Sequence, residues 1–223
     1  MEIVKKQITL HHTVSVIGGF MGGYTIFNHS DVFANAQTGN LIRLVLSACS
    51  GDFGSIGFLA LSFAVYAAGN AFYAVARRYS RLSMKIVSLI ITSLSVPPVS
   101  VLCLSGNPIL SILPLCFAMP VQWNAYKSAA GNSSATTFSS NNVRQAVIQL
   151  TNYLMDRDRK SARNARFYWM TLLCFHIGVA ASCLLSLFFS VQSIWFAYFF
   201  IAAAAVAYYR YESEKIRAFP DRK

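Results

Sequence analysis

The sequence has few charged residues. Only 12% of its 223 residues are Asp, Glu, Lys or Arg, whereas 55% are hydrophobic, and the mean hydropathy is +0.47. A soluble domain usually carries about 25% charged residues, so this chain has roughly half the usual amount. The shortage argues against a soluble globular enzyme or a disordered protein. It favours an integral membrane protein with a single transmembrane domain over residues 1–223.

The sequence also lacks the residue sets that carry out catalysis. It contains no carboxylate pair, no Ser/His/Asp or Cys/His set, no glycine-rich phosphate loop and no cluster with metal-ligand spacing. Its five cysteines form no CxxC pair, and we interpret them as packing thiols. Because catalysis needs positioned acids, bases or nucleophiles, we expect no enzyme, no cofactor and no metal site.

Acidic residues are scarcer than basic ones, with 8 Asp and Glu against 19 Lys and Arg. Such an excess is typical of nucleic-acid-binding proteins and also of the cytoplasmic loops of membrane proteins. Here the basic residues cluster between apolar runs, as in 77–85 and 157–166. Their position favours membrane topology, and we expect contact with membrane lipid and none with nucleic acid.

Six apolar runs are long enough, at about 17–25 residues each, to cross a hydrocarbon core of ~30 Å as helices. We estimate their bounds as 11–28, 55–78, 84–104, 108–128, 167–189 and 193–210. Backbone groups must be paired in lipid and the runs do not alternate, so we expect helices and no strands. The predicted fold is an all-α polytopic bundle of about six spans.

Two further segments are too polar to be ordinary spans and too apolar to be ordinary loops. Residues 28–40 precede the short apolar stretch 41–49, and residues 132–142 precede the stretch 143–154. Each begins with Gly, Asn, Ser or Thr, which break or cap helices, and ends in a short helical pattern. We interpret them as two re-entrant helices that enter the membrane and return.

The positive-inside rule supports this interpretation. If neither polar segment crosses the membrane, 16 of the 19 basic residues fall in loops on one side, and Lys127 lies at a helix end there. The remaining two, Arg43 and Arg144, belong to the polar segments. The links near 50–54, 105–107 and 190–192 then face the other side without Lys or Arg. We therefore expect both tails, 1–10 and 211–223, to be cytoplasmic.

The two halves of the chain show a weak internal repeat. Aligning residues 35–41 with 137–143 pairs Asn40 with Asn142, a shift of 102 residues, and a small gap then pairs Gly69 with Gly178. Each half, about 11–104 and 108–210, contains a span, a re-entrant segment and two more spans. Three crossings is an odd number, so the second half is inverted, as in many transporters whose sites lie between the repeats. Chance recurrence of helix breaks is the alternative.

These motifs resemble those of a known family. The string VFANAQTGNL at 32–41 resembles the TGN-L signature of the YoaK-like, or DUF1275, membrane proteins. The string AMPVQWNA at 118–125 is similar to their A-M-G-x-Q-N-A segment, and TTFSSNNVRQ at 136–145 is similar to T-T-x-x-T-G-x-L. The resemblance covers nearly the whole chain and implies a bacterial inner-membrane protein with about six spans. It implies no biochemical activity. In two places the chain departs from the family: glycines replace an Asp of the first helix near 22–23, and the second TG pair is Ser140-Asn141.

The candidate binding residues lie in the two polar segments and the fourth apolar run. They are Gln37, Thr38, Gly39, Asn40, Arg43, Gln122, Asn124, Ser140, Asn141, Asn142 and Arg144. Helix N-termini favour anions or polar ligands, but the residues at these positions can equally be ordinary caps. The amides either join helices or line a polar path, and the two arginines either assist binding or reach the headgroups.

Two functions fit this pattern. The first is a small secondary transporter or channel-like permease for a small anionic or neutral polar solute, with its path between the two re-entrant motifs. The second is a membrane scaffold or regulatory subunit that transports nothing and uses the basic loop at 156–166 to meet a partner or anionic lipid. A homodimer is compatible with a bundle of this size.

Overall fold

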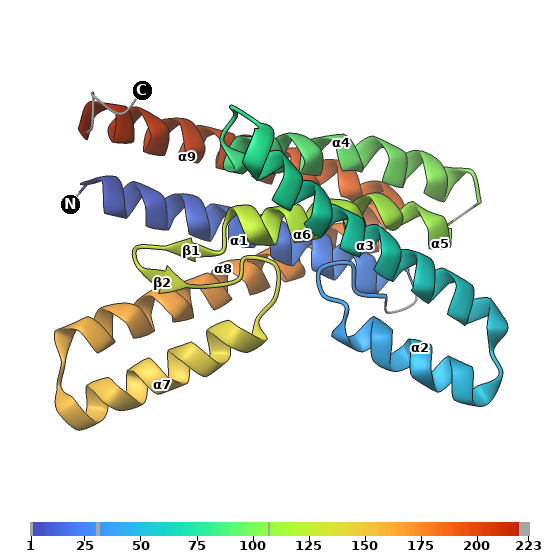
Figure 1. The fold of residues 1–223 in the computed structure, drawn as a ribbon, viewed down its shortest axis with the longest axis horizontal. Helices are drawn as coiled ribbons and strands as arrows, with labels where there is room; N and C mark the ends of the chain where they lie inside the picture. The colour runs from blue at the N-terminus through green and yellow to red at the C-terminus, as the bar shows by residue number, and fades with distance from the viewer. Residues whose placement is uncertain (1, 30–31, 107, 219–223) are drawn as a thin grey trace.

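The chain folds into a helical bundle with one short hairpin (Figure 1). The computed structural model describes residues 2–29, 32–106 and 108–218. The elements are α1 (Glu2–Asn28), α2 (Thr38–Ser50), α3 (Phe53–Tyr79), α4 (Met84–Leu104), α5 (Pro108–Ser111), α6 (Leu113–Ala125), β1 (Ser128–Ala129), β2 (Asn132–Ser133), α7 (Ser140–Asp156), α8 (Arg159–Phe189), the 3-10 helix η1 (Ser190–Phe196) and α9 (Ala197–Ala218). The expected all-α class is confirmed.

The hairpin was not expected from the sequence. β1 and β2 pair antiparallel, with Ser128 opposite Ser133 and Ala129 opposite Asn132. Their two-residue turn consists of Ala130 and Gly131, which both have positive φ (51° and 79°), as a type I′ turn requires. The expected fourth span therefore ends at the C-terminus of α6, because this polar turn follows it directly.

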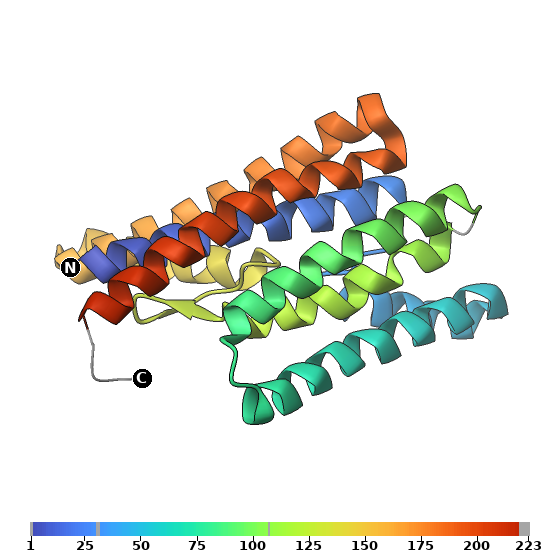
Figure 2. The same cartoon turned by 90° about the horizontal axis from the view of Figure 1, so that it is seen from above.

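Helices α1 and α6 occupy the interior of the bundle. α1 packs against α8 and α9, while α6 packs against α3 and α4 (Figure 2). Every residue from Ile17 to Thr25 is buried, so α1 is covered on all sides over two turns. The glycines of α1 and its neighbours permit this close packing, since a side chain on Gly19 or Gly178 would meet the backbone of the facing helix.

By length and composition, three stretches of the described residues can cross a membrane. They are Phe53–Tyr79, Met84–Leu104 and Arg159–Ala218, the last of which comprises α8, η1 and α9. α1 is not among these three stretches. It lies in the interior of the bundle, where protein and not lipid surrounds it, so it needs no continuous apolar surface. The chain is thus a membrane-like helical bundle, and the six crossings stay a prediction.

Two similar turns connect the short helices to the long helices that follow them. α2 ends at Gly51 and α7 ends at Arg157, both in the left-handed conformation (φ 74° and 54°). The next residue caps the following helix: Asp52 accepts a hydrogen bond from Ser55 N at 3.2 Å, and Asp158 accepts one from Ser161 N at 2.9 Å. Each short helix therefore folds back along a long one as a helical hairpin.

Both chain termini lie at the same end of the bundle (Figure 1). Lys6 Nζ and Glu214 Oε2 form an ion pair at 2.6 Å, and Lys85 Nζ lies 4.4 Å from the ring centre of Tyr211. The predicted tails are helical as far as the structure describes them, because α1 begins at Glu2 and α9 continues to Ala218. Residues 219–223 of the second tail lie outside the described residues.

Replacing Gly178 with alanine should destabilise the bundle. The added Cβ would meet Val16 O and Phe20 N of α1, and overpacking of this kind costs about 1–3 kcal/mol. Gly57→Ala is the matched control, because a Cβ on Gly57 in α3 meets nothing within 4 Å and should add about 0.5–1 kcal/mol of stability. Thermal unfolding in detergent measures both variants, and equal unfolding temperatures would contradict the close packing of α1 and α8.

The two capping carboxylates should make stability depend on pH. Hydrogen bonds from Ser55 to Asp52, and from Lys160 N and Ser161 N to Asp158, lower the pKa of each carboxyl below its usual value of 3.8. Their contribution is therefore complete above about pH 4 and is lost as the pH falls through the lower folded-state pKa. In acid titrations of thermal stability, the double variant Asp52→Asn/Asp158→Asn should lose less stability than the wild type. The prediction is wrong if the double variant loses as much stability as the wild type over the same pH range.

Candidate functional site

Two asparagines hold the polar loops that precede the short helices. Asn40 Nδ2 donates to Phe33 O at 3.0 Å, and Asn142 Nδ2 donates to Ala135 O at 2.6 Å. In each case the acceptor lies seven residues earlier in the chain. The side-chain oxygens are also paired, Asn40 Oδ1 with Phe33 N at 3.3 Å and Asn142 Oδ1 with Ser134 Oγ at 2.9 Å. Both asparagines are buried, and their side chains form these hydrogen bonds within their own loops.

A third asparagine joins the two loops to the central helix. Asn35 Nδ2 donates to Gly18 O of α1 at 2.7 Å and to Thr137 O of the second loop at 2.8 Å. Gly18 and Gly22 provide the space, because a Cβ on Gly18 would meet Thr136 O and one on Gly22 would lie 2.7 Å from Asn35 Nδ2. The four glycines between positions 18 and 23 thus permit both helix packing and close approach of the loops.

The short helices begin directly after these loops, where Thr38, Gly39 and Ser140 are exposed, and run away from each other (Figure 1). Among the described residues, no side chain caps the first turn of either helix: Gln37 and Ser139 occupy the N-cap positions without making a capping hydrogen bond. The first N–H groups of a helix have no partner within the helix and carry a partial positive charge. The capping alternative therefore does not account for the polar residues at these two helix starts.

A cleft of about 560 Å³ lies where the two helices begin. Two kinds of residue line it, small or polar residues of the motifs and aromatic rings. They are Ala36, Gln37, Thr38, Gly39, Ser139 and Ser140, with Phe33, Tyr66, Trp123, Phe138 and Phe175. The structure thus brings together four of the predicted site residues, Gln37, Thr38, Gly39 and Ser140. None of the described lining residues is charged.

Several polar atoms around the cleft and its loops are buried without a hydrogen-bond partner among the described residues. Gln37, which lines the cleft, is 7% exposed; its Oε1 accepts from Asn40 Nδ2 at 3.2 Å, whereas its Nε2 has no partner. Asn35 Oδ1, Thr136 Oγ1 and Thr137 Oγ1 in the motif loops are also unpaired. Buried polar groups usually find partners, and of these four residues Gln37 lines the cleft, whereas Asn35, Thr136 and Thr137 lie outside its lining.

Two further cavities adjoin the cleft toward the end of the bundle that holds the termini. One of about 340 Å³ shares Trp123 and Phe138 with the cleft. The rings of these two residues pack edge to face with their centres 4.9 Å apart. The next cavity, of about 300 Å³, includes Lys127, Arg77 and Lys85. A ring pair is thus the boundary between the central cleft and a polar, basic region.

Three of the predicted amides lie near the cleft but outside it. Gln122 is fully buried in α6, where its Nε2 donates to Val14 O of α1 at 3.3 Å and its Oε1 has no partner among the described residues. Asn124 Nδ2 donates to Asn70 Oδ1 at 2.9 Å and lines the adjoining cavity together with Asn141. Gln122 and Asn124 therefore join helices, and Asn124 also faces a cavity.

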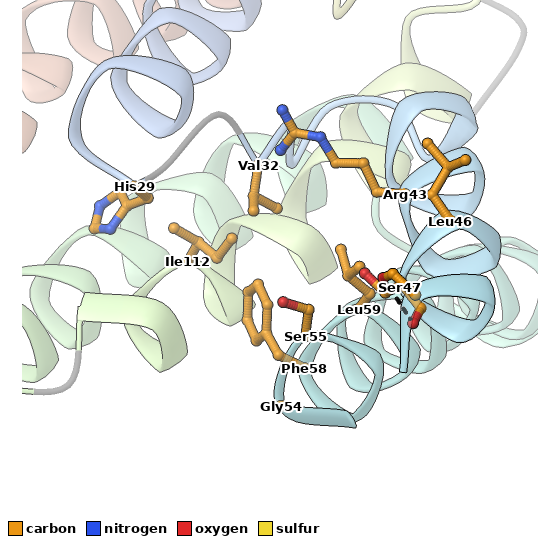
Figure 3. A pocket seen from close by; sticks show the side chains of 11 residues that line it. His29, Val32, Arg43, Leu46, Ser47, Gly54, Ser55, Phe58, Leu59 and Ile112 are labelled. Atoms are coloured by element: carbon orange, nitrogen blue, oxygen red, sulfur yellow. Dashed lines mark hydrogen bonds between the residues drawn. The ribbon is translucent and has the colours of Figure 1, made fainter. Parts of the chain in front are cut away.

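The two arginines lie outside the cleft. Arg144 is exposed on α7, where its Nη2 donates to Asn141 Oδ1 at 3.2 Å. Arg43 lines a separate cavity of about 670 Å³, and its side chain extends toward Val32, across the cavity from Phe58 and Leu59 (Figure 3). Both arginines follow the first turn of their helices, so the helix rotation directs them away from the shared N-terminal cleft.

Sequence reasoning missed the aromatic half of the cleft. The internal repeat contained a usable signal, because Tyr66 and Phe175 each lie three residues before the paired glycines Gly69 and Gly178. It also pairs Asn35 with Thr137, and those two residues are in contact in the structure.

Replacing Asn142 with alanine should destabilise the protein by about 1–3 kcal/mol, because it leaves Ala135 O and the Ser134 hydroxyl buried without this partner. The neighbouring change Asn141→Ala removes only an exposed contact with Arg144 and should cost less than about 0.5 kcal/mol. Denaturant unfolding in detergent compares them. Equal stability of the two variants would show that the asparagine does not hold the loop.

Comparison with known proteins identifies the family of the chain. The sequence model of the family described as "Protein of unknown function (DUF1275)" matches residues 10–207, which is most of the chain and includes both motif loops. No curated protein and no solved structure matches the chain. The match confirms the resemblance drawn from the three motifs, and the chain belongs to the DUF1275 family.

Proposed function

We propose that this protein is a small secondary transporter or channel-like permease whose path passes through the cleft between α2 and α7. The observation that carries the proposal is that two uncapped helix N-termini, from different halves of the chain, border one cavity. A structural role alone gives no reason for two helices to begin at one shared cleft without a capping side chain. A solute path needs such groups, because they bind a polar solute without a charged side chain.

An inverted repeat accounts for how the cleft is built. The contacts of α1 with α8 and α9 correspond to those of α6 with α3 and α4. The Asn40 and Asn142 loops, the two hairpin turns and the Gly69 and Gly178 contacts fit the same correspondence. In this proposal each half contributes one re-entrant helix, and the cleft lies at the interface of the halves, where transporters of this plan bind their substrates.

The charge distribution supports a definite orientation. The basic clusters at 77–85 and 157–166 and the described parts of both tails belong to the end of the bundle at which the termini lie. By the positive-inside rule we assign this end to the cytoplasm, with six crossings and α2 and α7 entering from opposite faces. We also assign the protein to a bacterial inner membrane, as the family resemblance implies.

The lining of the cleft restricts the solute. A cation site in a low-dielectric interior needs carboxylates or several carbonyl groups, and the described lining residues include no carboxylate. The polar groups present are hydroxyls, one amide and helix N-termini, which suit a small anion or a neutral polar solute.

The Trp123–Phe138 ring pair would then be the inner gate, because it separates the cleft from the basic region. The proposal involves no catalytic step and no cofactor, and it leaves a homodimer open to test.

Water access to the cleft is the first test of the proposal. In a background without the five native cysteines, Ser140→Cys should react with a membrane-impermeant methanethiosulfonate about tenfold faster than Val147→Cys. Ser140 lines the cleft, whereas Val147 lies half-exposed on the outer surface of the same helix, where lipid keeps its thiol protonated. Labelling rates in proteoliposomes provide the measurement.

Flux is measured in the same vesicles. Osmotic swelling with formate, acetate and urea as probe solutes should be faster than in protein-free vesicles, and modification of Ser140→Cys should block it. Modification of Val147→Cys should leave the swelling unchanged. An unreactive Ser140→Cys together with swelling no faster than in protein-free vesicles would exclude a transport path and favour the scaffold.

A further inference from the structure

The walls of the cleft are aromatic to an unusual degree for a site that begins at two polar motifs. Five rings border it, and they come from the two motif loops and from α3, α6 and α8: Phe33, Phe138, Tyr66, Trp123 and Phe175. Trp123 and Phe138 are already packed edge to face, which leaves their other surfaces for a ligand. A cavity of about 560 Å³ is in the range that holds a small organic molecule and is larger than an inorganic ion needs.

The polar side of the cleft carries positive potential without any basic side chain. Each helix N-terminus is equivalent to about +0.5 of an elementary charge, so α2 and α7 together present about one positive charge. Gln37 adds an amide Nε2 that is buried, unpaired among the described residues and on a side chain that lines the cleft. The charge of one monoanion would match these groups, and its oxygens would accept the unpaired N–H groups.

Aromatic walls by themselves also suit a cation, because the faces of the rings are negative. The rest of the lining opposes that alternative. The described lining residues contain no carboxylate, and both helix starts would repel a positive charge. The rings therefore contact the apolar body of the ligand, and the helix N-termini stabilise its negative charge.

We propose that the cleft selects a small organic monoanion with a flat apolar body, such as an aromatic carboxylate, over inorganic and aliphatic anions. The carboxylate lies between the first turns of α2 and α7 beside the Gln37 amide, and the ring lies among the five aromatic side chains. This inference rests on the proposed transport function, because it names the solute class of the same cleft.

Binding to the purified full-length protein tests the proposal, with benzoate as the probe in titrations followed by thermal shift and calorimetry. Benzoate should bind about tenfold or more tightly than each of three comparison ligands, since each lacks one recognised feature. Benzamide lacks the charge, acetate lacks the ring, and benzyltrimethylammonium has the opposite charge. No binding of benzoate at millimolar concentration, or equal binding of any comparison ligand, would overturn the proposal.

The variant Gln37→Glu tests the assigned position of the carboxylate. It keeps the oxygen that accepts from Asn40 but replaces the free Nε2 with a negative charge, so benzoate affinity should fall by about tenfold or more. Gln149→Glu is the matched control, because Gln149 Oε1 also accepts from an asparagine, Asn164, and lies away from the cleft. It should bind benzoate like the wild type.

A second variant keeps the test valid if Gln37→Glu does not fold. Trp123→Leu removes one ring and should weaken benzoate binding while leaving acetate binding unchanged, whereas an equal change for both ligands would overturn the role of the rings.

The labelling and swelling experiments separate this inference from the proposed function. If acetate or formate crosses the vesicles and benzoate is not preferred, the solute class is wrong and the transport path stands.

Discussion

The side chain of Asn35 is the interaction on which the interior of this protein depends. One amide group donates to Gly18 O of the central helix and to Thr137 O of the second polar loop, and the side chain is fully buried. Both loops are therefore held against the middle of α1. Because the loops end there, α2 and α7 both begin at the cleft, where Thr38, Gly39 and Ser140 are exposed. The cleft and its two uncapped helix starts follow from that placement.

Close backbone approach makes the arrangement possible. The α1 helix has alternating glycines: Gly18 and Gly22 face the loops, and Gly19 and Gly23 face α8. In a bilayer, helices gain little from burying apolar surface against each other, so contact at short range and hydrogen bonds decide their packing. A single helix can meet two loops and a neighbouring helix only if it has no side chains at those positions.

The same arrangement divides the polar residues into two functional groups. Asn35, Asn40 and Asn142 use their hydrogen bonds to hold the loops, and so they stabilise the cleft without facing it. Thr38, Gly39, Ser140 and the Gln37 amide line it and leave N–H groups available. The asparagines that are most prominent in the sequence thus have a structural role, and the less prominent residues beside them form the candidate site.

The sequence by itself determined the helical class, the family and the existence of two matched polar segments, because low charge, long apolar runs and repeated helix breakers are local properties of the chain. It also placed Thr38, Gly39 and Ser140 at helix starts and Gln37 among the amides in or next to spans. Only the tertiary structure decided that Tyr66, Trp123 and Phe175 join them, since these rings lie on three other helices, α3, α6 and α8. It likewise decided that Arg43 and Arg144 turn away from the cleft, because the rotation of each short helix is fixed by its packing against a neighbour, which sequence spacing does not encode.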